Sequence, residues 1–436
     1  MSTTIVSDTV ADAGSPSAAS AGGSGAADSR GWLGLVSIAL GQLMLALDAT
    51  IMNVALPSVE RALDFSAAVR PWIVSAYLLP FALLLLPGGR VADALGQKRV
   101  FVISLLGFAS ASALGGAAQT WPVLVLARAL QGAFAAALAP SALSLVAVGF
   151  QQPGERARAF GVYGAVAASG GALGLVLGGL LVRAVGWRAC LYVNVPIAIV
   201  AAIGVSACVP ASARVAGREP LLRSLQELLG DSVRRRLISV ASLSVAAMAG
   251  LFLLLTYYFQ SLRGSSPLDT GLAFLPLSLG GMLGSSLIAR RLMPRLAPRL
   301  LIGGALGVAA LGMLLLGRAR LDSSYVLHLG PAMLLVGVGI GAAMMPCFSL
   351  ATLGVEPWRA GLASALITTA QQLGGALGAA TLSVVAARVS AAASGEHGAA
   401  ASLHGHAAAV GVGASLSIVA ALVATGIVTA GRGERR

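Results

Sequence analysis

Apolar runs of about 20 residues recur along almost the whole chain, and they are the feature that most limits what it can fold into. One such run, wound as a helix, spans the ~30 Å hydrocarbon core of a bilayer. Composition agrees, because 57% of the 436 residues are hydrophobic and only 10% are charged. We therefore predict an all-α integral membrane protein.

The runs predict twelve transmembrane helices in two bundles of six, over 31–210 and 237–430. Expected spans of the first bundle are about 32–57, 72–87, 100–118 and 121–150, a fifth through Gly170, and a sixth at 187–210. Those of the second are about 237–260, 271–289, 300–317, 325–353, 361–387 and 406–430. We expect a disordered cytoplasmic tail over 1–30, a basic linker over 211–236 and a short tail over 431–436.

The formal charge of +13 is explained by membrane topology rather than by nucleic acid. Most of the 29 Lys and Arg residues lie in segments that share one side of the bilayer with the termini and the linker. Cytoplasmic loops carry such an excess of basic residues. We therefore expect a multi-pass monomer in the cell (inner or plasma) membrane, with both termini cytoplasmic and no nucleic-acid partner.

The first span contains one carboxylate, Asp48, with no other charge between Trp32 and Pro57. A charged side chain in hydrocarbon is costly, so it usually faces an aqueous cavity or a partner. At about 100° per residue, Gln42 and Asn53 share one helix face and Asp48 points roughly 120° away from it. Asp48 is therefore a candidate proton-binding residue; the alternative is an Asp that caps a break ahead of Pro57.

Arg128 lies well inside the fourth span, where a basic side chain needs a counter-charge or a wet cavity. It shares a helix face with Gln131, three residues further on. Structural pairing and a direct role in coupling are both compatible with this position.

The segment GGRVADALGQKR, residues 88–99, joins the second and third spans. Gly89 allows close helix approach and Gly96 allows a tight turn. Asp93 beside Lys98 and Arg99 forms a charge cluster that can hold one conformation and release it in another. We predict that this segment is a conformational switch.

Glycines at four-residue spacing predict tight helix contacts in both halves. They are Gly170, Gly174 and Gly178 in the fifth span and Gly374 and Gly378 in the eleventh. The switch segment also has a second copy between the eighth and ninth spans, with Pro294 in place of Asp93. Parallel repeats across a basic linker are typical of transporters with a site between two bundles.

These motifs resemble those of the major facilitator superfamily, and specifically of its drug:proton antiporter branch. LDATIMNVALP (47–57) resembles the first-helix motif of that branch, with Asp48 in the acidic position, and GGRVADALGQKR resembles the superfamily's loop motif. LARALQGAFAAALAP (126–140) resembles the fourth-helix motif, in which the Arg, here Arg128, is implicated in proton coupling. The resemblance runs from Trp32 to about Val385.

The resemblance implies a proton-coupled exporter of drug-like or antibiotic small molecules that works by alternating access. Its partners would be a small-molecule substrate, protons and the lipid bilayer, and it would need no cofactor beyond the proton gradient. A proton-coupled importer or a metabolite exporter of the same fold is the alternative. Three departures are twelve spans instead of the usual fourteen, Leu175 at a position where the fifth-helix motif has proline, and Ala94 and Gln97 where Arg is common.

Polar and aromatic side chains inside the spans are candidates to line a substrate cavity. They are Gln42, Asn53, Tyr77, Gln131, Tyr163, Tyr257, Gln260 and Gln371. For each of them the alternative is a hydrogen bond between helices, which is favoured for Gln260 and Gln371.

Other classes lack their motifs. No Gly-x-x-x-x-Gly-Lys-Ser/Thr loop occurs, which argues against ATP-driven transport, and no His-Glu-x-x-His or Gly-x-Ser-x-Gly pattern indicates an enzyme. Cys190, Cys208 and Cys347 are isolated, so we predict neither a disulfide framework nor a metal site.

Overall fold

The computed structural model describes residues 24–66, 68–150, 152–210, 221–353, 355, 360–393 and 399–427. Within these ranges, twelve helical spans are long and apolar enough to cross a bilayer, which confirms the predicted fold class. The helices of the first half are α1 (Ser24–Leu63), α2 (Arg70–Leu95), α3 (Gln97–Gly116), α4 (Trp121–Gly149), α5 (Pro153–Ala184), α6 (Ala189–Tyr192) and α7 (Asn194–Cys208).

The second half follows α8 (Leu221–Gly230), a short helix in the predicted linker. Its spans are α9 (Ser232–Tyr257) with the π-helical turn η1 (Tyr258–Leu262); α10 (Pro267–Ala273), α11 (Leu275–Leu283), η2 (Gly284–Ala289) and α12 (Arg290–Leu292); α13 (Pro298–Leu316); η3 (Tyr325–Leu329) and α14 (Gly330–Thr352); α15 (Ala360–Ala392); and α16 (Ala399–Thr425).

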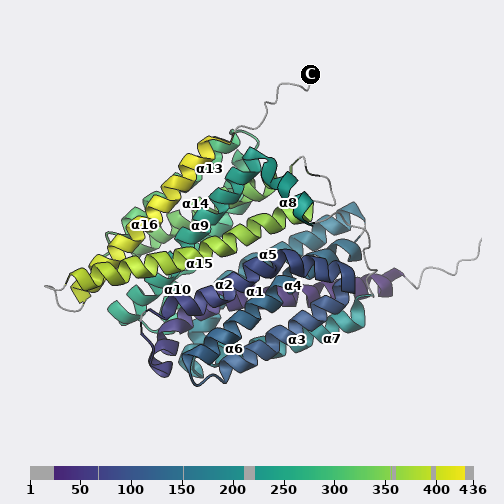
Figure 1. Ribbon diagram of the computed structural model, residues 1–436, viewed down its shortest axis with the longest axis horizontal. Coiled ribbons are helices and arrows are strands. Elements are labelled where there is room, and N and C mark those ends of the chain that lie inside the picture. The colour runs from purple at the N-terminus through teal and green to yellow at the C-terminus, as the bar shows by residue number, and fades with distance from the viewer. Residues whose placement is uncertain are drawn as a thin grey trace, which may run out of the picture.

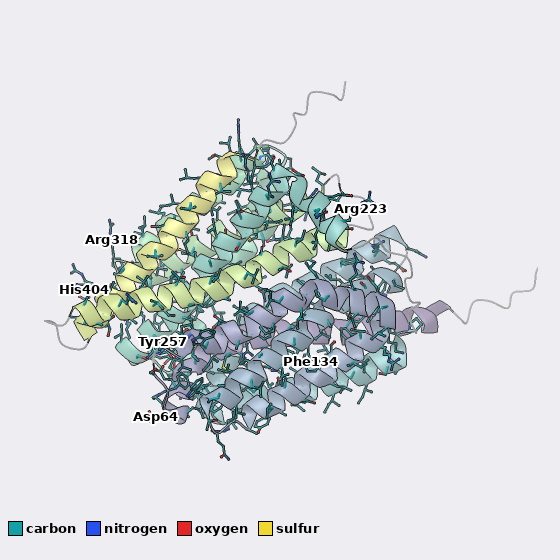
Figure 2. The ribbon with its side chains drawn as sticks, viewed as in Figure 1. Asp64, Phe134, Arg223, Tyr257, Arg318 and His404 are labelled. Atoms are coloured by element: carbon teal, nitrogen blue, oxygen red, sulfur yellow. The ribbon has the colours of Figure 1, made fainter. Side chains whose placement is uncertain are left out.

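The two halves lie side by side, with helices of the first half in the lower part of Figure 1 and those of the second half in the upper part. They meet where α2 packs on α15 and α5 packs on α10. Figure 2 shows Asp64 and Tyr257 toward one end of the molecule and Arg223 of α8 toward the other. We call the end that carries Asp64 and Tyr257, opposite α8, the distal end.

Apolar clusters of the two halves interlock near the distal end. Val54 and Leu175, from the first half, lie fully buried in a cluster built mainly by the second half. Conversely, Leu253 and Ala379 of the second half lie in a cluster built mainly by the first. Leu175, the residue that replaces the family's proline, therefore helps to join the halves, and α5 runs through it without a break.

Several helices are longer than their apolar runs predict, because polar residues continue a helix beyond the hydrocarbon. Helix α1 begins at Ser24, so residues 24–30, which we expected in the tail, are helical. Helix α16 begins at Ala399 rather than at His406. Residues 1–23, 211–220 and 428–436, which include parts of the predicted tails and linker, lie outside the described residues.

Glycines in α5 and α15 let these helices contact α1 and α9 closely. A side chain at Gly174 would collide with Thr50 and one at Gly178 would come 2.8 Å from Ile51. In α15, side chains at Gly374 and Gly378 would collide with the backbone carbonyls of Ser242 and Ala246 in α9. The two halves thus use equivalent helix pairs.

Replacement of Gly378 by leucine is expected to destabilise the second half by about 1–3 kcal/mol, because the backbone of α9 must move to admit it. The matched control is Gly307→Leu, since a Cβ atom at that helical position meets no atom within 4 Å. Thermal unfolding of the purified protein in detergent measures both. Equal unfolding temperatures for the two variants would contradict this assignment.

Candidate functional site: a buried ion pair and a contact between the halves

Asp48 lies in the middle of the first bundle with no exposed surface (0%), although it is ionisable. Helix α1 positions it against α4, which presents Arg128, itself only 3% exposed. Arg128 Nη1 donates a hydrogen bond to Asp48 Oδ2 over 2.6 Å and forms a salt bridge with it. Both residues are therefore held as a buried ion pair.

Neutral side chains from three helices complete this cluster. Asp48 Oδ1 accepts hydrogen bonds from Gln131 Nε2 at 3.0 Å and from Asn194 Nδ2 at 2.9 Å. Both amides also donate to the hydroxyl oxygen of Ser112 in α3, and Gln131 Oε1 accepts from Arg128. Every group that contacts the Asp48 carboxylate through these bonds is a donor, as an ionised carboxylate requires.

Tyr77 of α2 covers the ion pair, with its ring centroid 4.5 Å from the guanidinium carbon of Arg128. Two polar atoms of the cluster, Arg128 Nε and Asn194 Oδ1, are buried without a hydrogen-bond partner. A cluster with unpaired polar atoms has a hydrogen-bonding pattern that can be rearranged at moderate cost.

The other face of α1 makes different contacts. Tyr163 of α5 donates a 2.6 Å hydrogen bond to Gln42 Oε1, and Asn53 Nδ2 donates to the carbonyl of Ala49 in its own helix. Gln371 Nε2 contacts the sulfur of Met344 at 3.4 Å. These polar side chains are half-buried and lie apart from the ion pair.

The switch segment contacts only the first half through the bonds that its described residues show here. Gly96 has a φ of 98° between α2 and α3, which favours glycine. Gln97 Nε2 donates to Asp93 Oδ1 at 2.8 Å, so the residue that departs from the family motif is a partner of the acid. Lys98 Nζ donates to the carbonyls of Ser206 and Val209 at the end of α7.

Gly89 faces Pro140 of α4 and Arg99 is exposed, which completes the predicted switch residues.

A second polar cluster joins the two halves at the distal end. Arg70 of α2 donates two hydrogen bonds to Glu60 of α1, at 2.8 and 2.6 Å, and its guanidinium carbon lies 3.9 Å from the ring centroid of Tyr257. The Tyr257 hydroxyl, from the second half, donates to the same carboxylate. Gln260 Nε2 donates to the carbonyl of Val54 at 2.9 Å. We call Glu60, Arg70, Tyr257 and Gln260 the distal closure.

Of the predicted site residues, Asp48, Arg128, Gln131 and Tyr77 come together in one cluster. Tyr257 and Gln260 lie instead in the distal closure, and Gln42 pairs with Tyr163. The analysis missed Ser112 and Asn194, although an Asn within the apolar sixth span was a usable signal. It also missed Glu60 and Arg70, because charges at the ends of spans are common.

Two helical bundles that meet through a few polar contacts at one end, with an ion pair buried in one of them, define a secondary membrane transporter. The chain belongs to the Major Facilitator Superfamily, since the model of that family matches residues 38–379. The predicted family is thereby confirmed.

Relatives with known roles cover most of the chain. The puromycin resistance protein pur8 of Streptomyces alboniger is 46% identical over 422 residues, which cover 84% of each chain. The cephamycin export protein CmcT of Amycolatopsis lactamdurans is 32% identical over 409 residues, covering 80% of this chain and 84% of its own. The crystal structure of a bacterial homologue of the human lysosomal transporter Spinster, inward-facing and unoccupied, has a TM-score of 0.76 at 17% identity, covering 91% of this chain and 96% of its own. This last likeness concerns the fold alone.

Proposed function

We propose that this transporter exports puromycin, or an antibiotic of similar size, in exchange for protons. The observation that carries the coupling is the Asp48–Arg128 pair, an ionisable acid buried in the wall of one bundle with only donors around it. Support for the substrate comes from the resistance and export proteins that resemble the chain.

Proton uptake by Asp48 would force its surroundings to change. A protonated carboxyl has an O–H that must donate, while Arg128, Gln131 and Asn194 all present N–H groups to it. The nearby Asn194 Oδ1, which has no partner, is an acceptor that could receive the new O–H after a small rotation. Loss of the charge also removes the attraction for Arg128, so protonation loosens the link between α1 and α4.

Access to Asp48 must alternate, because the carboxylate has no exposed surface in this conformation. We propose that the linker side is cytoplasmic, in line with the excess of Lys and Arg on that side. The distal end then faces outward, and the distal closure shuts the outer side. A substrate would enter from the cytoplasm and leave after the closure opens.

Transport into everted membrane vesicles tests this proposal. With an imposed inside-acid pH gradient, vesicles that contain the protein are expected to accumulate labelled puromycin, and a protonophore should abolish the accumulation. Accumulation that is unaffected by the protonophore would refute proton coupling. If puromycin moves in the opposite direction, into right-side-out vesicles, the chain is an importer.

Replacement of Tyr257 by phenylalanine tests the distal closure. The change keeps the ring against Arg70 but removes the hydroxyl that donates to the Glu60 carboxylate, a bond worth about 1.5–3 kcal/mol. Electron spin resonance between nitroxides at Asp64→Cys and Arg318→Cys, with the native cysteines replaced by alanine, is expected to show more of the population at long distances.

Tyr258→Phe is the matched control for this experiment. The Tyr258 hydroxyl bonds the carbonyl of Arg320 within the second half, so its loss should leave the distance between the halves unchanged. If Tyr257→Phe gives the same distances as the control, its hydroxyl does not hold the halves together.

A further inference from the structure

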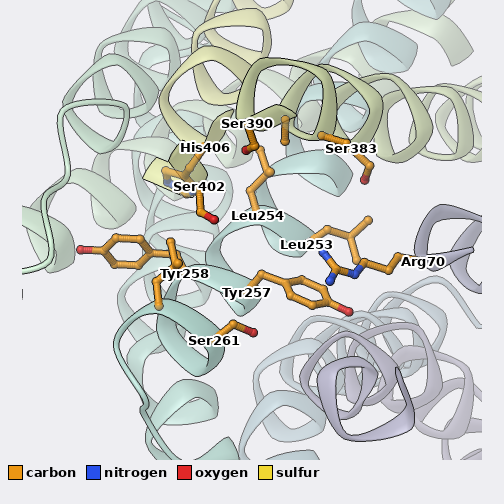
Figure 3. Close-up of a pocket in the computed structure, with 13 residues that line it drawn as sticks. Arg70, Leu253, Leu254, Tyr257, Tyr258, Ser261, Ser383, Ser390, Ser402 and His406 are labelled. Atoms are coloured by element: carbon orange, nitrogen blue, oxygen red, sulfur yellow. The ribbon is translucent and has the colours of Figure 1, made fainter. Parts of the chain in front are cut away.

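A cavity of about 370 Å³ lies at the distal end of the second half (Figure 3). Its walls come from α9 and η1, from α15 and from α16, and Arg70 of α2 closes one side. Small-molecule sites in proteins begin at about 300 Å³, so the space is large enough for a compact ligand.

His406 of α16 supplies the polar group that lacks a partner. It lines the cavity, is only 5% exposed, and its Nε2 is buried without a hydrogen-bond partner. Its ring is held beside that of Tyr258, with centroids 5.2 Å apart. A buried polar atom left unpaired costs about 1–3 kcal/mol, so a ligand that supplies the missing hydrogen bond gains that energy on binding.

The remaining lining indicates which ligand fits. Leu253, Leu254 and the ring of Tyr257 offer an apolar surface, and the Ser402 hydroxyl lies beside His406 in Figure 3. A ligand hydroxyl both donates and accepts, so it satisfies Nε2 in either tautomer of neutral histidine. The guanidinium of Arg70 at the rim disfavours a cation.

Two walls of the cavity belong to different halves, and this couples the cavity to the distal closure. Arg70 comes from the first half and Tyr257 from the second, and their contact is part of the closure. When the halves separate, the cavity loses the Arg70 wall. A ligand that binds the intact cavity better than the opened one must favour the closed state.

We propose that this cavity is a second binding site, for an uncharged, hydroxyl-bearing organic molecule with an apolar body, and that its occupant holds the distal closure shut and slows transport. The slowing of transport, and the outward position of the site, rest on the proposed function. The binding itself does not.

Covalent filling of the cavity tests the effect on transport. Ser402→Cys, in a chain whose native cysteines are replaced by alanine, is labelled with hydroxyethyl methanethiosulfonate, which leaves a hydroxyethyl disulfide in the cavity. Puromycin export is expected to fall at least about fivefold relative to the same protein before labelling, and to recover on reduction. Puromycin binding from the linker side should persist, which distinguishes a held closure from unfolding.

The matched control is Ala400→Cys, an exposed position two residues earlier on α16, where the same label should not change export. If Ser402→Cys does not fold, Ser383→Cys on the opposite wall replaces it. Export unchanged by a label that mass spectrometry shows to be in place overturns the proposal, as does failure of the label to reach either position.

A second measurement does not depend on transport. In the doubly spin-labelled protein described above, 2-naphthol is expected to shift the Asp64–Arg318 distances toward the short population, and His406→Leu should remove this shift. If 2-naphthol acts equally on both proteins, or on neither, the cavity proposal fails. If instead this shift is seen and the parent protein exports no puromycin, only the proposed function fails.

Discussion

Asp48→Asn is expected to reduce proton-driven export to the level of vesicles without the protein. Asparagine can keep the hydrogen bonds from Gln131 and Asn194, but it can neither take up nor release a proton. The measurement is puromycin accumulation in proteoliposomes under an imposed pH gradient, with the amount of folded protein determined by size-exclusion chromatography.

Folding needs its own control here, because asparagine leaves the Arg128 charge buried without a counter-charge. The double variant Asp48→Asn with Arg128→Gln removes both charges and should fold yet remain inactive. Asp322→Asn, a similar change at an exposed carboxylate in the loop after α13, should transport like the parent. Gradient-driven export by the folded Asp48→Asn protein would eliminate Asp48 as the proton carrier.

Arg128→Leu is expected to be among the most destabilising single changes in the first half. It leaves the Asp48 carboxylate buried with two amide donors but no positive charge, and breaking a buried pair in this way costs about 3–5 kcal/mol. Thermal unfolding in detergent at neutral pH should show a large decrease in unfolding temperature.

Addition of Asp48→Asn to Arg128→Leu should recover most of the lost stability, because no unpaired charge then remains. Such non-additivity is the expected result of direct contact. If the two changes destabilise the protein independently, the pair makes no net energetic contribution, and Arg128 has another role.

The number of helices could be predicted from sequence because each span must satisfy its own backbone hydrogen bonds in lipid. That requirement makes the apolar run, which is a local feature, sufficient to locate a helix. Helix ends were less predictable, as at Ser24 and Ala399, since nothing forces a helix to stop where the hydrocarbon stops.

The candidate site was only partly predictable. An acid and a base within apolar runs, Asp48 and Arg128, are conspicuous in any sequence because their burial needs a reason. Gln131 was expected in the cavity wall and instead bonds Asp48, and Tyr257 lies in the distal closure. Which neighbour a polar side chain meets depends on helix rotation and on contacts more than 100 residues apart in sequence, as between Asp48 and Asn194, with 146 residues between their positions.

The interlocked apolar side chains near the distal end bear on how temperature affects export. Val54 and Leu175 of one half, and Leu253 of the other, must become wet whenever the outer side opens. Hydration of apolar surface carries a positive heat-capacity change, so the enthalpy of opening should rise with temperature. Where opening limits the rate, a plot of the logarithm of the export rate against reciprocal temperature should therefore be curved rather than straight.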